Sequence, residues 1–237
     1  PGYDLIIPVL LSDAIYAPKV EKSTGNYTYT IGSEVADLHV DIPAAIVKKQ
    51  SILRTTLHYM NRGIEDDNDF NLVWTNIQSI NRIESSKKTK EALRKTYTRI
   101  SALHKRGWDG IWLQIISNFL WSVELPKFDY VIGNPPWVSW SSLPELYRER
   151  VKETAESYNI FSEHKRYGGN ELDISALLTY TVADRWLKEE GTLLFLLPQN
   201  HLQNDSSSGF RQLKIADNYL QPTFVEDLKD LSIFADA

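Results

Sequence analysis

The sequence predicts a mixed α/β protein in which a parallel sheet is interrupted by a mainly helical insertion. Between residues 41 and 125 apolar side chains recur at helical spacing, whereas beyond Pro126 short apolar strands alternate with helices. Apolar strands that alternate with helices are typical of a parallel sheet covered on both faces. We therefore expect three parts: a sheet segment at 1–40, a helical insertion at 41–125 and a second sheet segment at 126–237.

The first forty residues predict one buried strand and a hairpin. Leu5–Leu11 is apolar and rich in branched side chains, and it ends at Ser12-Asp13. Tyr27–Ile31 and Val35–Val40 are expected to pair as a β-hairpin, because Gly32-Ser33 between them favours a turn.

Four helices are expected in the insertion. Asp41 can cap the first helix, with Pro43 in its first turn, and a loop at Arg62–Asp69 ends it. The fourth helix is expected at Ile111–Leu120. The residues of the first two helices that we expect in the core are Ile46, Leu53, Leu57, Met60, Phe70, Val73, Trp74 and Ile77.

The third helix is expected at Lys87–Arg106 and is strongly basic, with Leu93, Tyr97 and Ile100 on its apolar face. Net charge is −5, which does not favour nucleic-acid binding by the overall field. Glu84–Arg106 nevertheless contains eight basic residues against two acidic ones. This helix could lie along phosphates or form a solvated face with ion pairs, and both interpretations stay open.

Past Pro126 the pattern predicts three strands and two helices. Phe128–Ile132 is a short apolar strand, and Asp173 is suited to cap the helix that begins there. The later elements are expected as a helix at Asp173–Glu190, a buried strand at Thr192–Pro198, a helix at Phe210–Ala216 and a strand at Thr223–Val225.

Composition excludes several classes of protein. The 237 residues contain no cysteine, so disulfide scaffolds and thiol nucleophiles are excluded, and a reducing cytoplasm is the expected location. The five histidines have no paired ligand spacing, so we expect no metal. The longest apolar run is too short to span a bilayer, so no membrane partner is expected. Oligomeric state is left open.

The segment with the strongest chemical signal is Gly133-Asn134-Pro135-Pro136-Trp137, directly after the expected strand. Two prolines cannot continue the strand ladder, so they fix a turn at the carboxyl end of the strand, where open α/β sheets bind ligands. The Asn134 amide and the Pro135 carbonyl are acceptors, and Trp137 offers a flat face. Together they suit a planar amino group on a heterocycle; the alternative is a tight turn with a packing tryptophan.

This segment, FDYVIGNPPW, resembles the fourth motif of the S-adenosyl-L-methionine (SAM)-dependent DNA adenine-N6 methyltransferases of the γ class, as found in large type II restriction-modification polypeptides. Gly168-Gly169-Asn170 and Asp173–Leu177 are similar to the linking segment and fifth motif. Gly191–Pro198 is similar to the sixth motif and Gly209-Phe210-Arg211 to the seventh. Pro8–Asp13 resembles the third motif, and Asp230–Phe234 the eighth.

The resemblance implies a partial Rossmann-like methyltransferase sheet with SAM as cofactor and double-stranded DNA as partner. Its implied catalytic residues are Asn134, Pro135, Pro136 and Trp137, and its implied cofactor-binding residues are Asp13, Asn134 and Pro135. A flipped adenine would stack on Trp137 and on Phe234. Asp13 as a turn residue, and Phe234 as a core residue, are the alternatives.

Two departures from the family pattern bear on activity. The first motif, Phe-x-Gly-x-Gly, and the acidic residue that would hold the cofactor ribose are both missing. We therefore expect a segment of a longer polypeptide that binds SAM poorly alone, with DNA sequence choice in other parts. Two alternatives stay open: a methyltransferase of an RNA base or glutamine amide, and a catalytically silent scaffold.

Overall fold

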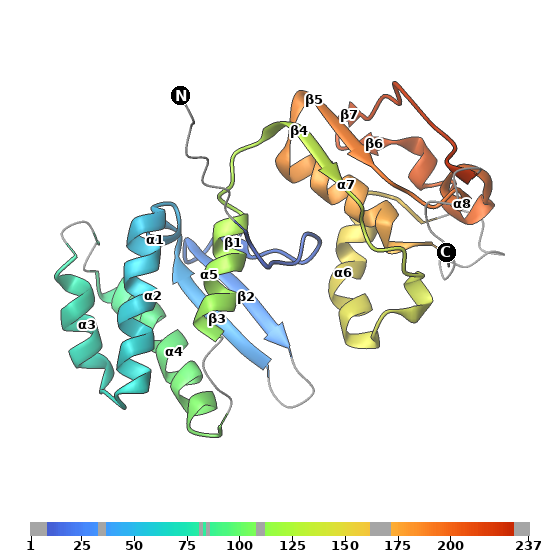
Figure 1. Ribbon diagram of the computed structural model, residues 1–237. Coiled ribbons are helices and arrows are strands. Elements are labelled where there is room, and N and C mark those ends of the chain that lie inside the picture. The colour runs from blue at the N-terminus through green and yellow to red at the C-terminus, as the bar shows by residue number, and fades with distance from the viewer. Residues whose placement is uncertain are drawn as a thin grey trace, which may run out of the picture. The chain divides into compact units, whose positions relative to one another are not determined.

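A computed structural model describes residues 9–32, 37–80, 83, 86–107, 112–161 and 172–229. These residues form two compact units, whose elements are labelled in Figure 1. The first unit consists of the residues up to 13 and residues 17–125. The second consists of residues 14–16 and the residues from 126 onward. The chain thus passes from one unit to the other at Pro126, where the sequence pattern changes.

The first unit contains an antiparallel sheet with the strand order β1-β2-β3. Its strands are β1 (Lys19–Glu21), β2 (Asn26–Gly32) and β3 (Asp37–Pro43). The predicted hairpin is confirmed by the pairing of β2 with β3, although residues 33–36 at its turn lie outside the described residues. Strand β1 was not predicted, because its three residues are all exposed and two of them are charged.

One face of this sheet is apolar and packs on helices. Tyr29 lies opposite Val40 on that face, and its ring centroid is 4.6 Å from that of Phe119. The opposite face is polar, and there Thr30 Oγ1 and His39 Nδ1 are 2.8 Å apart. Alternation of apolar and polar residues along both strands follows from this one-sided burial.

The described residues of this unit also form five helices. They are α1 (Ala44–Val47), α2 (Gln50–Glu65), α3 (Phe70–Gln78), α4 (Lys87–His104) and α5 (Trp112–Ser122). The first predicted helix is divided into α1 and α2, but all eight residues expected in the core of the first two predicted helices are buried. The apolar face predicted for the basic helix is buried as well.

The predicted helix cap at Asp41 is wrong. Asp41 lies in β3, and α1 begins after Pro43. The Asp41 N–H donates to Thr96 Oγ1 of α4 at 2.9 Å, and that hydroxyl donates to the Asp41 carbonyl at 3.0 Å. The Arg99 guanidinium donates to the His39 carbonyl at 2.9 Å. Helix α4 thus satisfies the outer edge of β3, and the chain at Asp41 stays extended.

The first long helix also runs further than the predicted loop at Arg62–Asp69 allows. Helix α2 continues to Glu65, because Ile64 is buried and because Gly63 permits close packing on α3. A Cβ at Gly63 would lie 2.2 Å from Val73 Cγ2.

The second unit contains two parallel strands, β4 (Phe128–Gly133) and β5 (Leu187–Phe195). Helices α6 (Glu145–Ser157) and α7 (Ile174–Trp186) come between them in the chain, and α7 packs along β5 (Figure 1). The predicted strand at Phe128 and its parallel pairing are therefore confirmed. The short elements are the 3-10 turns η1 (Trp140–Ser142), η4 (Asp205–Ser207) and η5 (Phe210–Gln212), helix α8 (Asn200–Gln203), and strands β6 (Lys214–Ile215) and β7 (Asn218–Tyr219).

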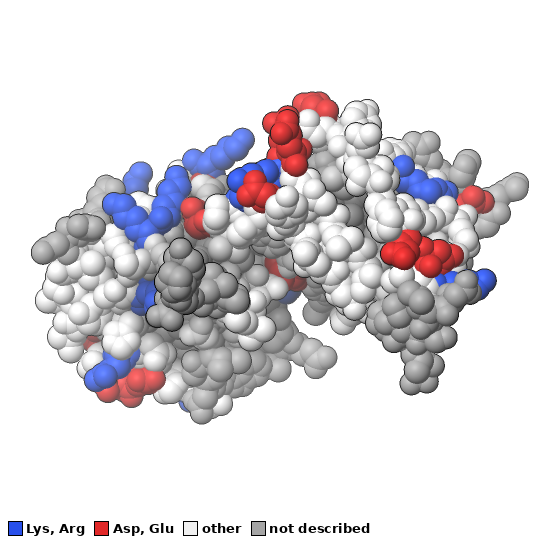
Figure 2. Space-filling view, turned by 45° about the horizontal axis from the view of Figure 1, so that its top comes forward, with Lys and Arg blue, Asp and Glu red and all other residues white. Residues whose placement is uncertain are grey.

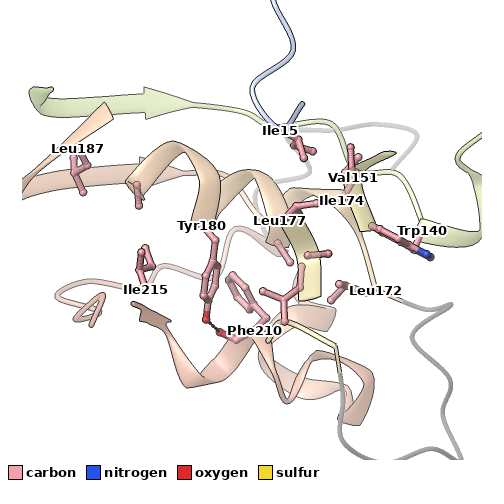
Figure 3. Close-up of a cluster of buried hydrophobic side chains, with 14 residues drawn as sticks. Ile15, Trp140, Val151, Leu172, Ile174, Leu177, Tyr180, Leu187, Phe210 and Ile215 are labelled. Atoms are coloured by element: carbon pink, nitrogen blue, oxygen red, sulfur yellow. Dashed lines mark hydrogen bonds between the residues drawn. The ribbon is translucent and has the colours of Figure 1, made fainter. Parts of the chain in front are cut away.

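The core of this unit surrounds α7, as Figure 3 shows. Tyr180 is fully buried there, and its hydroxyl donates to the Phe210 carbonyl at 2.7 Å. Burial raises the pKa of this hydroxyl to about 12. Ile15 joins the same core, and the Arg185 guanidinium donates to the carbonyls of Ala14 and Ile15.

The predicted boundaries after residue 173 need correction. Helix α7 ends at Trp186 rather than Glu190, because Leu187 begins β5 opposite Phe128. The predicted helix at Phe210–Ala216 is wrong: it is one 3-10 turn followed by β6. The predicted strand at Thr223–Val225 is wrong too, because those residues are irregular and exposed.

The described residues cover only one face of the sheet, and not the two faces that the sequence pattern predicts. Val131 and Leu193 pack against the core, whereas Ile132 is 76% exposed and Leu194 55%. The strand predicted at Leu5–Leu11 is also wrong where it is described, because residues 9–11 are irregular. Its first residues lie outside the described part of the chain. A mixed α/β protein is confirmed.

Candidate functional site

The Asn-Pro-Pro-Trp turn begins where β4 ends. Gly133 pairs with Phe195, the last residue of β5, and the Leu196 N–H donates to the Gly133 carbonyl at 3.2 Å. A Cβ at Gly133 would lie 3.0 Å from Phe195 Cε1, so the glycine allows the two strands to end side by side. The turn therefore leaves the carboxyl edge of the sheet, as its sequence predicts.

The four residues of the turn differ in exposure. Pro135 is buried, while Asn134 and Pro136 are exposed. No described residue hydrogen-bonds to the Asn134 side chain, so its amide is open to a ligand. Trp137 is 39% exposed, and its Nε1–H donates to the Leu196 carbonyl at 3.3 Å. That bond ties the indole to the loop after β5.

The segment after the turn is held by main-chain bonds to the start of α7. The Ile174 N–H donates to the Val138 carbonyl at 2.8 Å, and the Trp140 N–H donates to the Leu172 carbonyl at 2.7 Å. Between these two bonds, Ser139 forms an isolated β-bridge with Asp173. The residues that follow Trp137 are thus anchored to the second unit's central helix.

Asp173 caps that helix, which confirms the prediction of an N-cap. Its Oδ1 accepts from the Ser175 N–H at 2.8 Å and from the Ser175 hydroxyl at 2.5 Å. The same hydroxyl lies 2.8 Å from His201 Nε2, and His201 is 1% exposed. Burial lowers the pKa of His201, and the charge of Asp173 partly opposes this shift.

Sequence reasoning missed His201 and Ser175 as parts of this arrangement. His201 follows Pro198 and is one of five scattered histidines, and nothing in its spacing indicates a partner 26 residues away in the chain. The only available signal was the assignment of Asp173 and Ser175 to one helix start.

The remaining predicted site residues are less informative. Asp13 is partly exposed in an irregular segment before β1. Its cofactor role, and those of Asn134 and Pro135, stay predictions. Phe234 and Gly168-Gly169 lie outside the described residues. Among the described residues, no group of three or more His, Asp or Glu side chains could hold a metal ion.

The basic helix α4 has many partners of its own. Arg94 pairs with Glu91 at 2.9 Å, and Lys105 pairs with Asp67 at 2.7 Å. Lys90 Nζ donates to Asn71 Oδ1 at 3.0 Å. Arg99 donates to the His39 carbonyl of β3, so four of the eight Lys and Arg side chains between residues 84 and 106 have a bond inside the unit. These bonds favour the interpretation as a solvated face. On the face that Figure 2 shows, charged side chains of both signs form several separate groups.

Chemically, the turn presents an acceptor and a flat aromatic face at one edge of the sheet. An amide without an internal partner can accept a hydrogen bond from a ligand, and an indole held at its nitrogen can stack on a heterocycle. This pair suits a planar base that carries an amino group.

Comparison with known proteins gives the family. Residues 39–234 match the family described as the Eco57I restriction-modification methylase. Two type II methyltransferases of Haemophilus influenzae, M.HincII and M.HindII, are each 30% identical over 101 residues, which is 43% of this chain and 18% of the relative. The matched part therefore spans about a fifth of the length of these relatives. No solved structure matches the chain.

None of the helices in the described part of the chain is long and apolar enough to cross a membrane. The family match extends over far more than half of the sequence and includes the Asn-Pro-Pro-Trp turn. The chain belongs to the Eco57I restriction-modification methylase family.

Proposed function

We propose that this chain is a catalytic segment of a site-specific DNA methyltransferase in a restriction-modification system. The methyl group goes from SAM to the N6 amino group of a flipped adenine. The observation that carries this proposal is the exposed Asn134 amide beside the tethered Trp137 indole at the carboxyl edge of β4. Membership of a restriction-modification methylase family supports a DNA base over an RNA base or a glutamine amide.

The two acceptors act on the amino group of the base. Asn134 Oδ1 accepts one N6 hydrogen and the Pro135 carbonyl accepts the other, which draws the nitrogen lone pair out of the ring and orients it. Trp137 holds the ring by stacking. When bound, SAM supplies a methyl group activated by a sulfonium. The amino nitrogen would form a bond to that methyl carbon as the carbon–sulfur bond breaks and S-adenosylhomocysteine leaves, and it would release one proton to solvent, so no strong general base is needed.

The residues present are compatible with a cofactor at this edge. Asn134 is exposed and has no bond inside the described structure that a ligand would have to break. We propose Asn134 and Pro135 as residues that hold SAM. The β4–β5 pair would then be part of a larger Rossmann-like sheet.

Duplex DNA is the proposed partner, and we place its sequence-specific recognition outside this segment. The basic face of α4 is a candidate for additional phosphate contacts through Lys87, Lys88, Lys95 and Arg106, which are exposed. Such contacts would weaken steeply with salt.

The test is methyl transfer by the full-length parent protein. Duplex DNA is incubated with SAM labelled in its methyl group, and the modified nucleoside is identified by mass spectrometry. We expect N6-methyladenine from the wild type and none from Asn134→Ala, while SAM binding measured by calorimetry weakens but persists. Asn218→Ala, which removes an exposed amide on β7, is the matched control and should transfer normally.

Three outcomes would count against the proposal. Near-normal turnover in Asn134→Ala would remove the role of the turn. A methylated cytosine would replace adenine as the target base. No transfer by the wild type, with SAM and DNA both bound, would favour the silent scaffold.

A further inference from the structure

A buried chain of four polar side chains runs behind the Asn-Pro-Pro-Trp turn. Asp173, Ser175, His201 and Ser207 are all at most 7% exposed. They come from the N-terminus of α7, from α8 and from η4, and all belong to the second unit.

The hydrogen bonds of this chain fit one direction only. Asp173 is an acceptor, so the Ser175 hydroxyl donates its proton to Oδ1 at 2.5 Å. The Ser175 oxygen must then accept from His201 Nε2–H at 2.8 Å. His201 Nδ1 is left as the acceptor for Ser207 Oγ, 3.4 Å away. A neutral His201 completes this arrangement, as its lowered pKa favours.

The chain closes a ring of contacts around the turn. Asp173 bridges Ser139, two residues after Trp137. His201 lies five residues after Leu196, whose carbonyl accepts from the Trp137 indole. The bond between Ser175 and His201 therefore links two segments: the one that follows Trp137 in the sequence, and the loop after β5 whose Leu196 carbonyl binds the indole.

We propose that His201 and Ser175 are positioning residues that fix the plane of the Trp137 indole. The inference rests on the proposed function, because a fixed plane matters only if a base stacks on it. Neither residue touches the substrate. They act through the loop after β5 and through the start of α7, and a well-aligned platform favours transfer more than it favours SAM binding.

The alternative is ordinary core packing. The His201 ring centroid lies 4.8 Å from that of Phe210, so an apolar side chain could fill the same space. The two interpretations differ in what matters at position 201: a hydrogen-bond donor for Ser175, or only volume.

The first measurement is the indole N–H resonance of Trp137 in nitrogen-15-labelled 237-residue chain, assigned with Trp137→Phe. Ser175→Ala should shift this resonance and speed its exchange with solvent about tenfold, because the buried hydroxyl that links Asp173 to His201 is lost. Thr181→Val is the matched control, because Thr181 is an equally buried hydroxyl on α7 that bonds only within its own helix. An unchanged resonance in Ser175→Ala would overturn the proposal.

The second measurement compares two replacements of the histidine. His201→Gln keeps a side-chain N–H near the position of Nε2, whereas His201→Leu keeps only volume. We expect the wild-type Trp137 resonance with glutamine and the Ser175→Ala resonance with leucine. Equal behaviour of the two variants would support packing alone.

If any variant fails to fold, hydrogen exchange in the wild-type protein tests the same proposal. The exchange rates of the His201 Nε2–H and the Trp137 indole N–H should then agree within about threefold, because both open with the same ring of contacts. Exchange of the Trp137 indole N–H that is more than tenfold faster than exchange of the His201 Nε2–H would show that the four buried side chains do not hold the indole.

A last measurement separates this proposal from the proposed function. In the full-length parent, Ser175→Ala should lower kcat about twofold, as expected for loss of the Trp137 tether, and leave the KM for SAM unchanged. If the Trp137 resonance moves while kcat stays normal, the positioning is real and the role of Trp137 in catalysis is wrong.

Discussion

Two replacements of Trp137 distinguish the contribution of its flat aromatic face from the contribution of its hydrogen bond. Trp137→Phe keeps an aromatic face but loses the 3.3 Å bond to the Leu196 carbonyl. Because that bond is long and partly exposed, we expect it to contribute only about 0.5 kcal/mol, the lower end for a neutral bond. Trp137→Ala removes the face itself, and loss of base stacking costs about 1–3 kcal/mol.

These energies translate into distinct rates. A cost of about 0.5 kcal/mol lowers kcat/KM of the parent protein roughly twofold, whereas 1–3 kcal/mol lowers it about 5- to 150-fold. Stability should change less than for a buried aromatic residue, where removal costs about 3–5 kcal/mol, because 39% of Trp137 is already in solvent. We expect about 2 kcal/mol for Trp137→Ala in urea unfolding.

The assay uses duplex DNA with 2-aminopurine at the target adenine, whose fluorescence rises when the base leaves the stack. Trp137→Ala should reduce both this signal and methyl transfer, while Trp137→Phe retains most of both. Stacking on Trp137 would be contradicted if Trp137→Phe lowered base capture and methyl transfer as much as Trp137→Ala does. It would also be contradicted if a well-folded Trp137→Ala captured the base normally. A variant that simply unfolds would show that Trp137 is a packing residue.

Three further predictions concern stability. Gly63→Ala should lower the free energy of unfolding by about 1–3 kcal/mol in thermal unfolding, because the new methyl group would meet Val73 at 2.2 Å; an unchanged Tm would contradict the packing of α2 on α3. Tyr180→Phe should cost about 1–3 kcal/mol in urea, because the Phe210 carbonyl loses its buried donor, and ultraviolet titration should show one tyrosine, absent from the variant, that ionises near pH 12. The lowered pKa of His201 means that the unfolded chain binds its proton more readily, so this group's contribution to stability is present above pH 6.5 and is lost as pH falls through the folded pKa. His201→Gln should therefore flatten the decline in stability below pH 6.5, and parallel pH profiles for the two proteins would count against a buried neutral histidine.

Local patterns were sufficient where one periodicity governs a whole segment. The apolar spacing in α3 and α4 predicted both helices and their buried faces, because a helix has only one stripe to bury. The strand at Phe128 and the turn at Asn134 were predicted for a similar reason: two prolines end a strand whatever surrounds it. The cap at Asp173 was predictable because an N-cap bond, here from the Ser175 N–H, joins residues that are close in the sequence.

Tertiary structure decided what depends on a distant partner. Residues 187–190 continue a helical pattern in the sequence. Leu187 nevertheless pairs with Phe128 of β4 and begins β5, because strand pairing outweighs weak helix propensity. Asp41 could cap a helix, but Thr96 of α4 satisfies its main chain in an extended form. The bond between Ser175 and His201 joins residues that no periodicity relates. Sequence patterns alone thus predicted α3, α4, the end of β4 and the turn that carries the candidate chemistry. Only the folded chain brought together the buried side chains behind that turn, because burial and hydrogen bonding across sequence distance exist only after the elements pack.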